Sequence, residues 1–110
     1  MVFPFAFLPV SGEYYIADAL NFSNIKFIYN NKYQFSGKTN AYRYDFYLPE
    51  YDYYIEYTGM LINGVTKNKI IINYNNKLKS KIKLCKLHNL KFFVSIDYIS
   101  IIEFINELIK

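Results

Sequence analysis

Hydrophobic residues recur along this chain at two different spacings, and each spacing predicts an element. Near the N-terminus, Ser11 followed by Gly12 and Glu13 favours a helix start, with an acidic residue in the first turn. We expect this helix to end within residues 21–24 and a short strand to follow at residues 25–29. The helical spacing is carried by Ile16, Ala17 and Leu20.

Two runs of β-type residues then meet at a turn that Pro49 marks. We expect a strand at residues 41–48, a turn at residues 49–52 and a second strand at residues 53–58. Because side chains alternate along a strand, each run has two faces. The polar stretch at residues 30–40, which contains Gly37, predicts a turn or an irregular hairpin. The faces of interest are Arg43, Asp45 and Tyr47 on the first strand, and Tyr54, Glu56 and Thr58 on the second.

The C-terminal half predicts a loop at residues 60–66 and then a less certain segment at residues 69–74, which fits a strand or a helix start. A helical pattern follows at residues 75–88, then a strand at 90–95 and a helix at 95–110. The expected inward positions are Leu78, Ile82 and Cys85 on the first helix, and Ile99, Ile102, Ile105 and Ile109 on the second. The order αβββαβα predicts one α/β domain over residues 1–110.

Composition and net charge indicate the kind of partner and the cellular location. The net charge of +4 suits a polyanionic partner without requiring one. Cys85 is the single cysteine, which excludes an internal disulfide and a cysteine-based zinc site, and a reducing cytoplasm is the simplest location. Residues 1–10 are apolar but lack a basic leader and contain two prolines. They do not resemble a signal peptide or a membrane span, and we expect an arm that packs on the body or on a second subunit.

Asp45 and Glu56 are the candidate chemistry. Each lies in a mostly apolar strand, where a carboxylate is costly to bury unless it is paired or binds a cation. Two carboxylates on adjacent strands can build an oxygen-ligand site for Mg²⁺, with Mn²⁺ as a possible substitute. The alternative is structural, an ordinary ion pair with Arg43 or a lysine.

The strings around these two residues resemble the motifs of the PD-(D/E)XK nuclease superfamily. Asp45-Phe46 followed by Tyr-Leu-Pro is similar to the first motif, and residues 55–59 are similar to the second. Phage Holliday-junction resolvases and very-short-patch repair endonucleases carry similar strings. The resemblance covers nearly the whole chain from Ser11, and residues 81–86 and 89–93 resemble the closing helix and strand. It implies a restriction-endonuclease-like core, a central mixed four-stranded sheet flanked by helices.

The resemblance also implies roles. Asp45 and Glu56 would bind Mg²⁺ and activate water for phosphodiester hydrolysis, and Glu13 matches an acid that many members carry on the first helix. The chain departs from the pattern at Thr58, which stands where the motif has lysine. Three readings remain: the lysine has moved to the following helix, as Lys81 or Lys77; or Thr58 and water suffice; or the site is inactive.

Several further residues have expected roles outside the two carboxylate motifs. Arg43, Lys77 and Lys81 are candidate phosphate contacts. His88 is expected to be a helix cap or a surface residue, and Cys85 to belong to the core. A row of lysines opposite the apolar stripe is expected to be plain surface; it consists of Lys79, Lys83 and Lys86.

The expected function is therefore a metal-dependent DNA endonuclease. RNA remains open as a substrate, and a homodimer or a larger complex is expected because a short chain covers little DNA. The alternative is a catalytically inactive nuclease-like module that binds nucleic acid or a protein.

Overall fold

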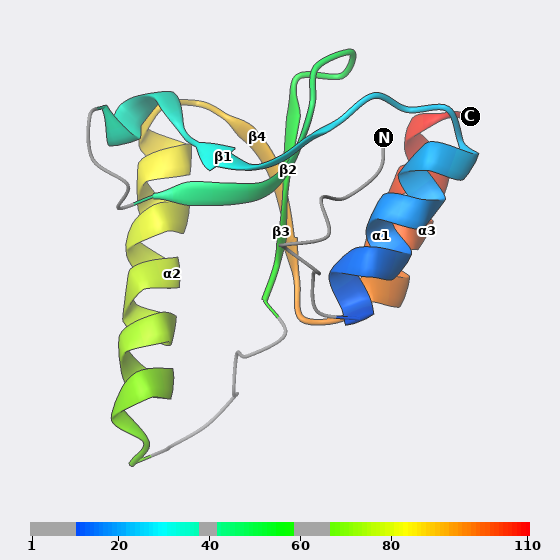
Figure 1. Cartoon of the computed structure of the whole chain (residues 1–110). Helices are drawn as coiled ribbons and strands as arrows, with labels where there is room; N and C mark the ends of the chain where they lie inside the picture. The colour runs from blue at the N-terminus through cyan, green and yellow to red at the C-terminus, as the bar shows by residue number, and fades with distance from the viewer. Residues whose placement is uncertain (1–10, 38–41, 59–66) are drawn as a thin grey trace.

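The computed structural model describes residues 11–37, 42–58 and 67–110. The chain has an α/β architecture, with a four-stranded mixed sheet flanked by three helices (Figure 1). This confirms the predicted class and the predicted mixed sheet. In chain order the elements are α1 (Ser11–Phe22), β1 (Ile28–Lys32), a short 3₁₀ helix η1 (Gln34–Ser36), β2 (Arg43–Leu48), β3 (Tyr53–Tyr57), α2 (Lys69–Leu87), β4 (Lys91–Ser95) and α3 (Tyr98–Leu108).

The strands lie in the order β1-β2-β3-β4. The first two pairs are antiparallel, with Tyr29 opposite Phe46 and Tyr47 opposite Tyr54. β3 and β4 are parallel, with Glu56 opposite Val94. A parallel pair needs a crossover connection, and α2 provides it.

The helices cover the two faces of the sheet unequally. Figure 1 shows α1 and α3 side by side on one face and α2 alone on the other. On the first face the larger apolar core joins Ile16 and Leu20 of α1 to Phe46 and Ile55 of the sheet and to Ile101 of α3. On the second face a smaller core consists mainly of tyrosines, packed with one residue of α2; it contains Tyr33, Tyr44, Tyr54 and Cys85.

The first strand begins later than the sequence predicts. Residues 25–29 were expected to form it, whereas β1 is Ile28–Lys32 and includes three residues assigned to a turn. Ile25 and Phe27 are buried ahead of the strand, as part of the larger core. β1 is an edge strand whose polar residues pair with β2 through the backbone, so apolar alternation does not mark it.

The uncertain segment at residues 69–74 is helical. α2 runs without interruption from Lys69 to Leu87. The side chain of Asn68 caps its first turn and so favours a helix start at this point. The Asn68 carboxamide oxygen accepts hydrogen bonds from the backbone N–H groups of Ile70 and Ile71. The strand alternative for this segment is therefore wrong.

The inward face of the last helix also differs from the prediction. Ile101 and Ile105 are fully buried, whereas Ile99 is 53% exposed and Ile109 lies beyond the helix end and is exposed. Ser95 belongs to β4, and Asp97 caps the helix by accepting from the N–H of Ile99. The helix therefore begins at Tyr98, later than the predicted start at residue 95.

Some predictions fall on residues outside the described ranges. These are the apolar arm at residues 1–10, the loop at residues 60–66 and part of the polar segment near residues 38–41. Among the described helices, none combines the length and the apolar character that crossing a membrane requires.

Candidate active site

The two predicted carboxylates lie where β2 and β3 separate. Their ladder ends at the pair of Phe46 and Ile55. One residue further, Asp45 uses its side chain instead of its backbone, and Oδ2 accepts a hydrogen bond from the Tyr57 N–H at 2.6 Å. The carboxylate of Asp45 is thereby fixed beside β3, close to Glu56.

Glu56 is buried on the face of the sheet that α2 covers, with 3% of the residue exposed. Its Oε1 accepts from the Tyr33 hydroxyl at 2.8 Å. Its Oε2 lies 3.1 Å from the ammonium nitrogen of Lys81, which reaches across from α2. A buried carboxylate thus has a neutral donor on one oxygen and a cation on the other.

Glu13 approaches the same region from α1. Its Oε2 accepts a short hydrogen bond from the hydroxyl of Tyr29 on β1. Gly12 allows this approach, because a Cβ atom at that position would overlap the hydroxyl oxygen of Tyr57. α1 therefore packs directly against the residue whose N–H holds Asp45.

The acidic residues repel one another electrostatically. Burial and the negative charge of Glu56 raise the pKa of Asp45 to about 8, although the Tyr57 N–H opposes the rise; Glu13 adds to it. Burial also raises the pKa of Glu56, against the opposing effects of Lys81 and Tyr33. Three carboxyl groups and one ammonium group leave this region short of positive charge.

Thr58, which the sequence resemblance aligns with the motif lysine, has a structural role. It is 1% exposed, its hydroxyl donates to the carbonyl oxygen of Ser95 at 3.2 Å, and its N–H donates to the same oxygen at 2.9 Å. The side chain therefore supports the junction between β3 and β4. Lys81, not Thr58, presents its polar atom to Glu56.

The other two predicted phosphate contacts, Lys77 and Arg43, lie in different places. Lys77 is exposed one turn before Lys81, and the two line a small cavity of about 50 Å³ with Tyr74 and Leu78. Arg43 is bound at the sheet edge, where its guanidinium donates to the side chain and the carbonyl of Asn30. A larger cavity of about 530 Å³ lies at the α1–β1 connection, and the described residues that line it include no acidic one.

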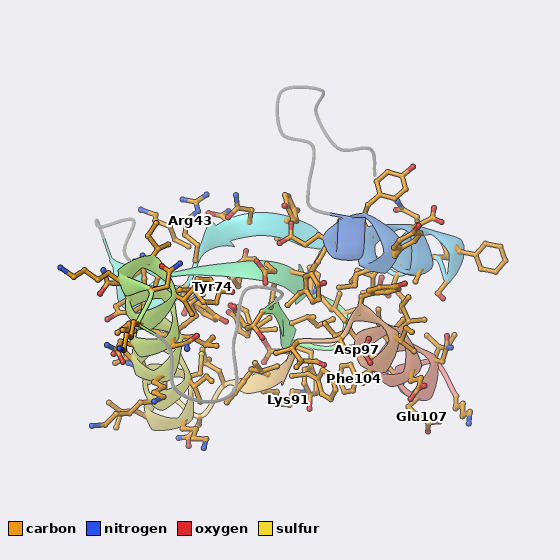
Figure 2. The ribbon with its side chains drawn as sticks, turned by 90° about the horizontal axis from the view of Figure 1, so that it is seen from below. Arg43, Tyr74, Lys91, Asp97, Phe104 and Glu107 are labelled. Atoms are coloured by element: carbon orange, nitrogen blue, oxygen red, sulfur yellow. The ribbon has the colours of Figure 1, made fainter. Side chains whose placement is uncertain are left out.

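Tyr74 is a residue that sequence reasoning missed. Figure 2 shows it between α2 and the strands. Burial and the charges of three acidic residues raise the pKa of its hydroxyl to about 12. Those residues are Asp45, Glu56 and Glu13, so Tyr74 lies in the electrostatic field of the whole acidic group.

Tyr29 and Tyr33 were also missed, since nothing in their spacing distinguishes them among 13 tyrosines. Tyr33 stacks on Phe35, with ring centroids 4.8 Å apart, and Phe35 stacks on His88 at 5.3 Å. His88 is the exposed C-cap residue of α2, and Cys85 is buried against the tyrosines, both as the sequence predicts.

Two carboxylates of this region could serve as ligands of a hard divalent cation. Within residues 11–37, 42–58 and 67–110, no three His, Cys, Asp or Glu side chains are arranged to hold a metal ion. Asp45 and Glu56 supply two carboxylates, and Mg²⁺ commonly binds through one or two carboxylates and keeps several waters. A cation bound by the two carboxylates would compensate the charge repulsion that, with burial, raises the pKa of Asp45.

In comparisons with family models, curated proteins and solved structures, nothing matched this chain.

Proposed function

We propose that this chain is a metal-dependent endonuclease that hydrolyses DNA, with a PD-(D/E)XK-type site whose lysine comes from a helix. One observation carries the proposal: the ammonium nitrogen of Lys81 on α2 lies 3.1 Å from Glu56, beside Asp45. Two carboxylates and a lysine are the groups that this chemistry requires, and the strand threonine does not supply the third.

Each residue has a separate role in the proposal. Asp45 and Glu56 would hold Mg²⁺, which, when bound, polarises the phosphate and lowers the pKa of water. The Lys81 side chain is 15% exposed, and its ammonium group would place a positive charge where negative charge develops on the phosphate. Tyr33 fixes the Glu56 carboxylate, and Tyr29 fixes Glu13.

The experiment is cleavage of a panel of labelled nucleic acids with Mg²⁺, with Mn²⁺ and with EDTA. The panel contains plasmid, linear duplex, single strand, four-way junction and RNA. Asp45→Asn and Lys81→Gln test the two groups, and Lys81→Arg keeps the charge. Asp18→Asn and Lys26→Gln, both at exposed positions, are the matched controls.

We expect metal-dependent cutting that falls at least about 100-fold in Asp45→Asn and Lys81→Gln. The control variants should cut as the wild type does. Cutting that persists in EDTA, or that is equal in Asp45→Asn and Asp18→Asn, would refute the proposal. Cutting of RNA alone would change the substrate and keep the chemistry.

One observation favours the second candidate, an inactive nuclease-like module. Both oxygens of Glu56 already have protein partners, so the ion pair with Lys81 compensates this carboxylate without a metal. Isothermal titration with Mg²⁺ and Mn²⁺ separates the two candidates. No heat of binding, together with no cutting of any substrate, would leave the inactive module as the function.

A further inference from the structure

Positive charge is concentrated on one helix. The chain has 13 basic and nine acidic side chains, and α2 carries six of the lysines and no acidic residue. The rest of the chain therefore has seven basic and nine acidic side chains, a net charge of −2. Figure 2 shows Glu107 of α3 at the opposite end of the molecule from α2. The +4 of the whole chain is thus a property of α2.

The lysines lie on both sides of the outward face of α2. Successive residues turn by about 100°, so Lys77 and Lys79 lie about 80° to either side of the direction opposite the buried Leu78. Lys77 and Lys81 form the site edge: they line one small cavity, and Lys81 contacts Glu56. The other side carries the outer lysine row, which consists of Lys79, Lys83 and Lys86, all exposed.

Between the two lysine edges α2 presents a polar face. It consists of Asn73, Asn76 and Ser80, which are all exposed. Asparagine carboxamides and serine hydroxyls both donate and accept hydrogen bonds, and asparagine pairs with adenine through two such bonds. Among the described elements α2 is the outermost layer on its side of the sheet, as Figure 1 shows.

The outer lysine row carries positive charge that no salt bridge among the described residues neutralises. Within the described ranges, the salt bridges are Lys81–Glu56 and Lys110–Glu107, and neither includes this row. Only Lys86 lies in the last turn, where the helix dipole favours a cation. Lys79 and Lys83 are four residues apart, a spacing at which like charges repel. A polyanion would relieve that repulsion.

We propose that α2 binds in the major groove of duplex DNA. The site edge follows the strand that is cut, the outer lysine row follows the phosphates of the opposite strand, and the polar face meets the base edges between them. The dimensions agree, because the groove is about 12 Å wide and a helix with its side chains is about 10–12 Å across. Duplex DNA is then the substrate class, and this choice rests on the proposed nuclease function.

The test measures binding without cutting. Fluorescence anisotropy follows labelled duplex DNA and the same single strand in EDTA, over a range of salt concentrations, with Asp45→Asn as the background. Lys79→Gln with Lys83→Gln removes two phosphate contacts. Lys26→Gln with Lys110→Gln makes the same charge change at exposed positions away from α2. A duplex with glucosylated hydroxymethylcytosine, which fills the major groove, is the second probe.

We expect Lys79→Gln with Lys83→Gln to reduce the slope of log K against log salt by about 1.8, since each phosphate contact contributes about 0.9. The control pair should leave the slope unchanged, and the glucosylated duplex should bind at least about tenfold more weakly. Equal effects of the two pairs, full binding of the glucosylated duplex, or equal binding of single strand and duplex would each overturn the inference. Competition by polyglutamate as strong as that by duplex DNA would overturn it too.

The two proposals fail separately. Groove binding as described, with no cutting in the nucleic-acid panel, refutes the nuclease and keeps α2 as a DNA-binding helix. Metal-dependent cutting with a salt slope that the Lys79 and Lys83 substitutions leave unchanged refutes the groove inference alone.

Discussion

The hydroxyl of Tyr33 lies 2.8 Å from Oε1 of Glu56, and both residues are buried. Tyr33 precedes the short helix η1, and Glu56 lies on β3, 23 residues later. The bond lowers the pKa of Glu56, in opposition to burial, and so favours the ionised carboxylate. A tyrosine distant in the sequence thus favours the charged form of a candidate metal ligand.

Tyr33→Phe should destabilise the protein by about 1–3 kcal/mol, because it leaves a buried carboxylate oxygen without its donor. The loss in the free energy of unfolding should be larger at high pH, where Glu56 is ionised, than at low pH. Urea denaturation at several pH values measures it. Tyr54→Phe is the control, since Tyr54 is also buried and belongs to the same tyrosine core as Tyr33. Equal losses in the two variants would contradict the assigned role of Tyr33.

Gly12→Ala should destabilise the protein by about 1–3 kcal/mol, although alanine ordinarily favours a helix over glycine by about 1 kcal/mol. The reason is the Tyr57 side chain, because its hydroxyl oxygen and ring carbons would overlap the added Cβ. Urea denaturation of Gly12→Ala, alone and with Tyr57→Ala, checks the cause. The second substitution removes the obstructing ring, so Gly12→Ala should cost less in that background; an equal cost would contradict the packing explanation.

The sequence predicts an element well where a single pattern fits it. In α1, Ile16 and Leu20 define one face, and both are buried as expected. In α3, isoleucines at four positions support more than one inward face, and the cap at Asp97 together with packing on the sheet decides between them. β1 is polar and depends on backbone pairing with β2, a long-range interaction that local pattern does not contain.

The same reasoning applies to the candidate site. Strand alternation placed Asp45 and Glu56 on corresponding faces, and helix spacing pointed Lys81 inward, where the structure places it beside Glu56. The tyrosine partners could not be predicted, because each joins elements distant in sequence and the chain has 13 tyrosines to choose from. The assignment to a nuclease superfamily stays a prediction that the cleavage experiment tests.

Ile101→Ala should cost about 2–5 kcal/mol in the free energy of unfolding, because Ile101 is fully buried between α3 and the sheet. Ile99→Ala, two residues earlier on the same helix, should change it by less than about 0.5 kcal/mol, because Ile99 is exposed. Urea denaturation of the two variants compares the faces directly. The face that the sequence predicted would require the reverse order.

Asp45 should make the metal-free protein less stable as the pH rises. Its ordinary pKa is about 3.9, and the folded protein raises it to about 8, so the folded state holds a proton that the unfolded state has lost between these values. Stability therefore falls with increasing pH by up to about 1.4 kcal/mol per pH unit in this window. Thermal unfolding in EDTA should show this fall for the wild type, and Asp45→Asn should be less sensitive to pH.

Mg²⁺ should reverse the trend if Asp45 is a ligand. Binding a cation at Asp45 requires loss of the same proton, so affinity should rise by up to tenfold per pH unit up to about pH 8. The rise in Tm that Mg²⁺ produces should therefore be larger at pH 8 than at pH 6, and absent in Asp45→Asn. Asp18→Asn is the matched control and should behave as the wild type does. A rise in Tm equal at both pH values, or retained in Asp45→Asn, would place any bound Mg²⁺ elsewhere on the protein.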